Sequence, residues 1–168
     1  MNVIIFGLPG SGKTFFAEKL ASRIGGSHIS SDTVRQQLQQ TDKYREQAKM
    51  AVYYEMLKLM GKAISHQQNT VLDATFYQQD IQKLFKKKAS LLNSPLYFIE
   101  IRADESTIRD RVSKKRKESE ADFKVYLQIK NVFEPLVEDH LILYSGRDEP
   151  EEMLTKTLTY INYQDGTV

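Results

Sequence analysis

The chain has 168 residues, of which 40% are hydrophobic and 27% charged, and its formal net charge is +2. This length is typical of one domain, so we expect a single domain over residues 1–168. The apolar and aromatic content excludes intrinsic disorder as the main state. The absence of cysteine excludes a disulfide scaffold, a cysteine-based zinc site and a cysteine nucleophile. The near balance of charges neither indicates nor excludes a nucleic-acid partner.

No apolar run approaches the ~20 residues that a membrane span requires. The N-terminal run from Val3 to Phe6 is too short for the core of a signal peptide, and no basic residue precedes it. We therefore expect a cytoplasmic protein without a membrane partner. The three histidines lack the spacing of metal ligands, so the sequence assigns them no role.

Short apolar runs alternate along the chain with stretches of helical periodicity. In chain order, we expect strands over residues 3–6, 28–30, 70–72, 96–101 and 140–144. Between and after them we expect helices over about 13–24, 32–38, 43–67, 79–92, 104–117, 122–134 and 150–160. Five strands that alternate with helices predict an α/β fold with a parallel sheet and right-handed crossovers.

The first predicted strand ends in the segment GLPGSGKT (residues 7–14), which fits the Walker A pattern G-x-x-x-x-G-K-[ST]. Glycines let such a loop curl so that its backbone N–H groups point at phosphate oxygens, and the following helix adds its positive dipole end. Lys13 would reach the β- and γ-phosphates, and the Thr14 hydroxyl would bind Mg²⁺. The residues expected to contact the nucleotide are Gly7, Pro9, Gly10, Ser11, Gly12, Lys13, Thr14 and Phe15.

Acidic residues follow the second and third predicted strands, at the edge where ligands bind in parallel sheets. Asp73 comes directly after Thr70-Val71-Leu72 and is typical of a carboxylate that holds Mg²⁺ beside Thr14, directly or through water. The alternative is that Asp73 caps the next helix, and both roles are compatible.

The segment SSDTVR (residues 30–35) places Asp32 and Arg35 on one helix face. A carboxylate that faces the γ-phosphate can accept the proton of an attacking hydroxyl, and the arginine can bind an acceptor or a phosphate. The alternative is a capping aspartate with a solvated arginine.

Residues 109–117 contain six basic side chains, among them Arg109, Arg111 and Arg116. Such a run is usually a solvated helix face. In a phosphoryl-transfer enzyme it can instead belong to a mobile lid that brings arginines over the phosphates. Spacing alone does not decide which face points inward.

These features occur in a recognisable order: the Walker A segment, Ser31-Asp32-x-x-Arg35, Asp73-Ala74-Thr75, the arginine-rich stretch and Phe133-Glu134-Pro135. Over about residues 1–145, the sequence resembles the small P-loop kinases of the polynucleotide 5′-kinase, zeta-toxin and chloramphenicol-phosphotransferase group. It is similar in particular to the stand-alone AAA-domain ATP-binding proteins of that group. These relatives often have an arginine early in the helix after the D-A-T segment, where Gln82 and Lys83 stand here.

The resemblance implies a three-layer α/β/α P-loop fold with strand order 2-3-1-4-5, a helical lid over about residues 104–135, and ATP with Mg²⁺ as cofactors. It implies that Asp32 is the general base and that Arg35 binds the acceptor or a phosphate. Arg111 and Arg116 match the lid arginines. The segment that ends in Arg147 lies where these kinases hold adenine.

The leading hypothesis is therefore a kinase that transfers the γ-phosphoryl group of ATP to a hydroxyl. The acceptor could be a polynucleotide 5′-hydroxyl, a nucleotide or a small molecule, and the modest net charge favours a small one. The alternative is a nucleotide-dependent switch or slow ATPase without an acceptor. The guanine signature N-K-x-D is absent from the sequence, which argues against a GTPase.

Overall fold

A computed structural model describes residues 1–38, 46–113 and 119–163 of the chain. Its sheet has five parallel strands in the order β2-β3-β1-β4-β5. This order confirms the expected fold. The strands are β1 (Asn2–Phe6), β2 (Ser27–Ser30), β3 (Thr70–Asp73), β4 (Leu96–Arg102) and β5 (Leu141–Tyr144).

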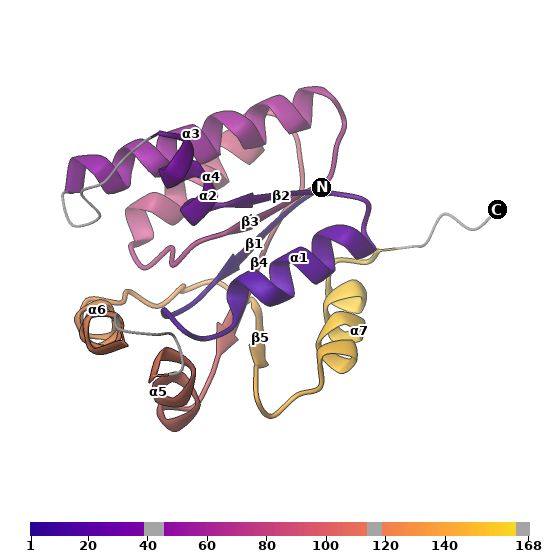
Figure 1. Ribbon diagram of the computed structural model, residues 1–168. Helices are drawn as coiled ribbons and strands as arrows, with labels where there is room; N and C mark the ends of the chain where they lie inside the picture. Colours follow the sequence, from indigo (N-terminus) through magenta and orange to yellow (C-terminus); the bar gives the residue numbers. More distant parts are fainter. Residues whose placement is uncertain (39–45, 114–118, 164–168) are drawn as a thin grey trace.

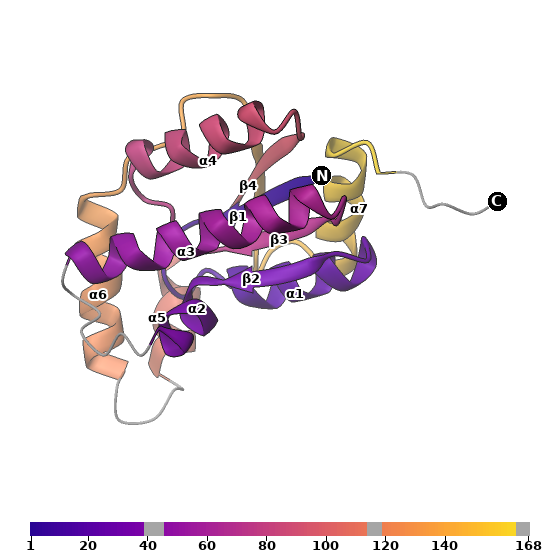
Figure 2. The ribbon, with the colours of Figure 1, turned by 90° about the horizontal axis from the view of Figure 1, so that it is seen from above.

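Helices cover both faces of the sheet and form a three-layer α/β/α fold (Figure 1). The helices are α1 (Lys13–Arg23), α2 (Ser31–Gln37), α3 (Glu46–Ser65), α4 (Gln79–Leu91), α5 (Glu105–Ser113), α6 (Ser119–Asn131) and α7 (Pro150–Tyr160). Figure 2 shows α3 and α4 over one face, with α1 and α7 behind the other. The expected lid region contains α5 and α6, which lie beyond the carboxyl ends of the central strands.

The central strand β1 is buried along its whole length because helices cover both of its faces. Val3 and Ile5 pack in the cluster that α1 and α7 complete. Ile4 and Phe6 pack in the cluster beneath α3 and α4. This packing explains why the sequence of β1 is a continuous apolar run rather than an alternating one.

The predicted boundaries differ from the structure by a few residues. The α2 helix begins at Ser31 and its cap is Ser30, whose hydroxyl accepts a hydrogen bond from the Asp32 amide at 3.3 Å. Asp32 is therefore not the N-cap of this helix. The α6 helix spans Ser119–Asn131 rather than 122–134. Residues 43–45 of the predicted helix over 43–67 lie outside the described residues.

Among the described residues, no helix is long and apolar enough to cross a membrane.

Candidate active site

The loop between β1 and α1 has the backbone of a phosphate-binding turn. Gly7 and Gly12 have φ values of +139° and +92°, which L side chains rarely adopt. A Cβ on Gly7 would also lie 2.3 Å from the carbonyl oxygen of Ile101, so the loop passes too close to β4 for any side chain. Gly12 is the N-cap of α1 and makes no side-chain cap, which leaves the first amides of this helix available to an anion.

Lys13 lies at the centre of this loop and donates a hydrogen bond to the carbonyl oxygen of Leu8 at 3.0 Å. Burial lowers the pKa of the Lys13 ammonium, while the nearby carboxylates of Asp73 and Asp32 act in the opposite direction. Both predicted acids therefore lie close enough to Lys13 to act on its charge. This is the arrangement that the sequence predicted at the carboxyl ends of β2 and β3.

Asp73 is the last residue of β3 and pairs in register with Ile5 on one side and Ser30 on the other. Its side chain is 4% exposed, and its Oδ2 lies 3.6 Å from Nε2 of His28. The N-cap of α4 is Gln78, so Asp73 does not cap that helix. His28 was given no role from the sequence. The available signal was its position two residues before Ser30 in the same strand, which places both side chains on the face that Asp73 shares.

Asp32 and Arg35 form a direct ion pair across one turn of α2, with Nη1 of Arg35 2.6 Å from Oδ1 of Asp32. The Asp32 side chain is 78% exposed, whereas Arg35 is largely covered at 22%. Because Ser30 caps the helix, the Asp32 carboxylate is not needed for that purpose. The capping alternative for Asp32 is therefore wrong, and the carboxylate is accessible to solvent.

Arg111 of α5 lies against the phosphate loop. Its Nη1 donates to the Ser145 hydroxyl at 2.9 Å and to the carbonyl oxygen of Gly10 at 3.3 Å. Ser145 in turn donates to the carbonyl oxygen of Ser11. A Cβ on Gly12 would lie 3.2 Å from both Nη1 of Arg111 and Oγ of Ser145. The segment after β5 and the α5 helix thus meet at the loop.

The remaining predicted residues have varied surroundings. Arg147 makes a two-point contact with Asp104, at 2.5 and 3.0 Å, and its guanidinium lies over the Tyr144 ring. Phe15 projects from the start of α1 with 64% of its surface exposed. Arg116 lies outside the described residues. From the same basic run, Arg109 packs over the Phe123 ring of α6.

The connection from β3 to α4 lies between the phosphate loop and α3. The amide of Gly7 lies 3.5 Å from the carbonyl oxygen of Thr75. The Tyr53 hydroxyl contacts the Thr75 hydroxyl at 3.2 Å and accepts a hydrogen bond from the Phe76 amide at 3.2 Å. Burial raises the pKa of Tyr53 to about 12, so the hydroxyl stays protonated.

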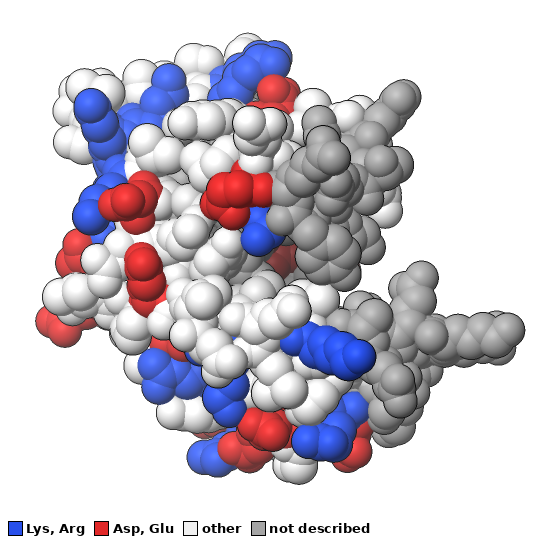
Figure 3. Space-filling view, turned by 90° about the vertical axis from the view of Figure 1, so that its left-hand side faces the viewer, with Lys and Arg blue, Asp and Glu red and all other residues white. Residues whose placement is uncertain are grey.

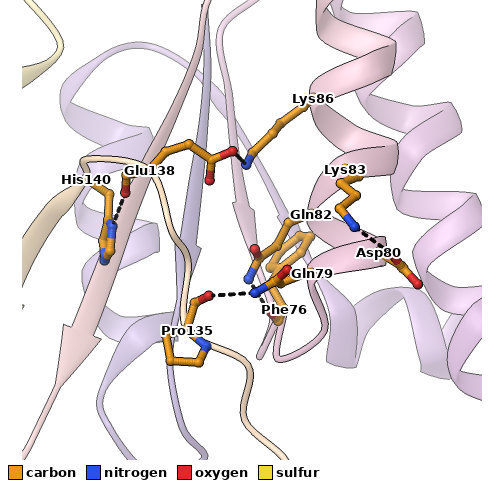
Figure 4. A network of polar contacts seen from close by, with 9 residues as sticks. All are labelled: Phe76, Gln79, Asp80, Gln82, Lys83, Lys86, Pro135, Glu138 and His140. Atoms are coloured by element: carbon orange, nitrogen blue, oxygen red, sulfur yellow. Dashed lines mark hydrogen bonds and ion pairs between the residues drawn. The ribbon is translucent and has the colours of Figure 1, made fainter.

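Further hydrogen bonds, some buried and some at the surface, hold the connection from β3 to α4 in place (Figure 4). Gln82, which stands near the family's frequent arginine position, donates to the carbonyl oxygen of Phe76 at 2.8 Å. The Glu134 carboxylate accepts from the Gln79 amide at 2.7 Å, and the Gln79 side chain donates to Pro135 at 3.3 Å. The segment that follows α6 is thereby joined to the start of α4.

The donor set fits a magnesium nucleotide. The Ser11 hydroxyl is buried in the loop and has no hydrogen-bond partner among the described residues. Thr14 supplies a hydroxyl, and Asp73 supplies one buried carboxylate. Within the described ranges, no three acidic or histidine side chains form a metal cluster. One protein carboxylate with a hydroxyl suits Mg²⁺, which takes its other oxygens from phosphates and water.

Figure 3 views the molecule from the side on which the strands end. Charges of both signs lie around the middle of this face, between the part built by α2 and α3 and the part built by α5 and α6. The face therefore presents both cations and carboxylates between these two parts of the molecule.

The fold and this set of residues define a small P-loop kinase. A family model described as "AAA domain" matches residues 3–136, so the chain belongs to this family. A comparison with curated proteins finds no significant match.

Solved structures share the fold at low sequence identity. A sugar kinase from Janibacter sp. HTCC2649 has a TM-score of 0.72 and 17% identity, covering 96% of this chain and 94% of its own. The APS kinase of Mycobacterium tuberculosis, solved with AMPPNP and APS, has a TM-score of 0.75 and 14% identity over 96% and 97%. A gluconokinase from Sinorhizobium meliloti 1021 has a TM-score of 0.70 and 14% identity over 96% and 91%.

Proposed function

We propose that this protein is an ATP-dependent phosphotransferase that moves the γ-phosphoryl group of ATP to a hydroxyl acceptor, with Asp32 as general base. One observation carries the proposal: the buried Asp73 at the end of β3 pairs in register with Ser30, the N-cap of the helix that holds the exposed Asp32. A buried carboxylate beside the loop suits a metal, whereas an exposed one suits a proton acceptor that meets an incoming substrate.

In the proposed reaction, the acceptor hydroxyl gives its proton to the Asp32 carboxylate as its oxygen bonds to the γ-phosphorus. The bond from that phosphorus to the bridging oxygen breaks, and ADP leaves with the electron pair. Arg35 holds the Asp32 carboxylate at 2.6 Å and so orients it toward the acceptor. Lys13 and the loop amides stabilise the charge on the phosphate oxygens.

Thr14 and Asp73 would hold Mg²⁺, which neutralises phosphate charge when it is bound. His28 lies against Asp73 on the side of β2 and restricts the position of its carboxylate. Lys13 now donates to the Leu8 carbonyl, a bond that it would exchange for phosphate oxygens.

The lid and the segment after β5 are proposed to hold the nucleotide from the opposite side. Arg111 and Ser145 lie against the loop backbone at Gly10 and Ser11. We assign the surface around Ser145 and Arg147 to the adenosine part of ATP and Arg111 to its phosphates or base. The Phe15 ring, exposed beside the loop, adds an apolar surface there.

The replacement Asp32→Asn tests the proposal, because it keeps the shape and removes the base. We expect the rate of phosphoryl transfer to fall by a factor of about 10²–10⁴, with the Kd for Mg-ATP nearly unchanged. The matched control is Asp80→Asn, since Asp80 also lies in the first turn of a helix and forms an i,i+3 ion pair, with Lys83 at 3.0 Å. The control should transfer at the normal rate.

Labelled ATP with a panel of hydroxyl acceptors provides the readout. Label on an acceptor that disappears with Asp32→Asn supports the kinase. Normal transfer by that variant would overturn the role of the base. Release of free phosphate alone with every acceptor would favour a switch or slow ATPase instead.

A further inference from the structure

The connection from β3 to α4 contains a strained residue. Phe76 has a φ of +45°, a left-handed conformation that bulky side chains rarely adopt. Its side chain is fully buried, and the centre of its ring lies 5.3 Å from that of Tyr53 and 5.0 Å from that of Phe85. Such a conformation persists only where the surrounding structure fixes it, and strained residues of this kind cluster at ligand-binding sites.

Two buried side chains hold the backbone of Phe76 from opposite sides. Its amide donates to the Tyr53 hydroxyl of α3 at 3.2 Å. Its carbonyl oxygen accepts from the Gln82 side chain of α4 at 2.8 Å (Figure 4). Tyr53 and Gln82 are 6% and 1% exposed, so water does not compete for these bonds. Because Thr75 directly precedes Phe76, the same two helices also fix the position of Thr75.

The directions of the hydrogen bonds make the Thr75 hydroxyl a donor. The Tyr53 oxygen uses a lone pair to accept the Phe76 amide, which leaves its one proton for a different partner. In the part of the chain that the structure describes, that partner is the Thr75 hydroxyl oxygen at 3.2 Å. A buried proton without an acceptor is costly, so Tyr53 donates to Thr75. The proton of Thr75 then remains available to a ligand.

Thr75 lies beside the phosphate loop. Its carbonyl oxygen is 3.5 Å from the amide of Gly7, the first residue of the loop. The next loop residue, Leu8, accepts from Nζ of Lys13 at 3.0 Å, and Lys13 is the side chain proposed to stabilise phosphate charge. Thr75 is partly exposed and follows the proposed magnesium ligand Asp73 by two residues. Its hydroxyl is therefore on the side of the loop that the outermost phosphate would occupy.

We propose that the Thr75 hydroxyl donates a hydrogen bond to an oxygen of the γ-phosphate and that Tyr53 is the positioning residue that directs this proton. The inference rests on the nucleotide site of the proposed function, but it does not depend on the identity of the acceptor. ADP lacks the γ-phosphate, so Thr75 distinguishes a triphosphate from a diphosphate.

The binding of Mg-AMPPNP and of Mg-ADP to the full chain, measured by isothermal titration calorimetry, tests the proposal. Thr75→Val keeps the shape of the side chain and removes the hydroxyl. We expect its Kd for AMPPNP to rise about tenfold or more, as for loss of a hydrogen bond to a charged group, while its Kd for ADP stays within about twofold. Thr75→Ser keeps the hydroxyl and should restore most of the AMPPNP affinity.

A double-mutant cycle tests the role of Tyr53. Tyr53→Phe should raise the Kd for AMPPNP about threefold or more and leave that for ADP nearly unchanged. The double variant should lose no more AMPPNP affinity than Thr75→Val alone, because Tyr53 acts through Thr75. The matched control is Tyr77→Phe, since Tyr77 is a buried tyrosine of the same connection whose hydroxyl accepts from Lys49 at 3.4 Å. It should change neither Kd.

The outcomes separate this inference from the proposed function. An unchanged AMPPNP affinity in Thr75→Val, or equal losses of affinity for both nucleotides, would overturn the contact with the γ-phosphate. Additive losses in the double variant would overturn the positioning role of Tyr53. A selective loss of AMPPNP affinity, in a protein that transfers phosphate to no acceptor, would support the contact and overturn the kinase. Failure of the wild type to bind either nucleotide would overturn both.

Discussion

Replacing Gly7 with alanine should destabilise the protein by about 3 kcal/mol, because the loop backbone here has two reasons to exclude a side chain. The φ of +139° costs an L residue roughly 1–3 kcal/mol. The new Cβ would lie 2.3 Å from the carbonyl oxygen of Ile101, and backbone must move to relieve this contact, at a cost of about 1–3 kcal/mol. The smaller entropy of the unfolded alanine chain offsets about 0.4–1 kcal/mol.

The matched control is Gly25→Ala. Gly25 also has a positive φ, +59°, but a Cβ there would meet nothing within 4 Å. Only the backbone strain of about 1–2 kcal/mol remains, less the same unfolded-state term, so we expect a loss of roughly 0–1.6 kcal/mol. The comparison therefore isolates the close approach of the loop to β4 from the φ preference.

Urea unfolding followed by circular dichroism measures both variants. For a chain of this size, 3 kcal/mol corresponds to roughly 6–12 °C in Tm. Equal losses for Gly7→Ala and Gly25→Ala, with unchanged m-values, would refute the argument from the Ile101 contact. The position of the phosphate loop against the sheet would then need another explanation.

Two further predictions concern buried hydroxyls and acid stability. The buried Thr70 hydroxyl donates to the Asn2 side chain at 2.8 Å, so Thr70→Val should lower the free energy of unfolding by about 1–3 kcal/mol. Thr157→Val should be nearly neutral, because the buried Thr157 hydroxyl has no partner among the described residues. Unfolding free energies that rank the two variants the other way would contradict this. The Lys86 ammonium, 2.5 Å away, holds the pKa of Glu138 below its usual value near 4.5. Stability from this pair is present above that pH and is lost as the pH falls through the lowered pKa. In unfolding measurements, Glu138→Gln should therefore be less stable than the wild type at pH 7, and the difference should disappear once the pH is below the lowered pKa.

The phosphate loop and the sheet could be predicted from the sequence because both depend on local patterns. The segment over residues 7–14 is contiguous, and its chemistry resides in backbone amides that glycines expose. A continuous apolar run is typical of a strand covered on both faces, as β1 is. The position of Asp73 followed from the rule that parallel strands present ligand-binding residues at their carboxyl ends.

The first residue of a predicted helix was harder to identify from the sequence, because several neighbouring residues were equally able to cap the helix. Ser30, Ser31 and Asp32 can each cap a helix, and the structure selects Ser30. Tyr54 is 56% exposed although its neighbour Tyr53 is buried, because the buried face of α3 contains Tyr53 and Met56. A shift of the buried face by one residue along the helix decides which of the two tyrosines is buried.

The sequence by itself determined that a Walker A turn follows the first strand and that acids follow the second and third, because each of these features consists of consecutive residues. Only the tertiary structure decided which side chains meet around them. His28 lies beside Asp73, Ser145 lies against Ser11, and Lys49 contacts Tyr77. These contacts join segments that are distant along the chain. Their geometry depends on how helices pack on the sheet, which no local pattern of residues records.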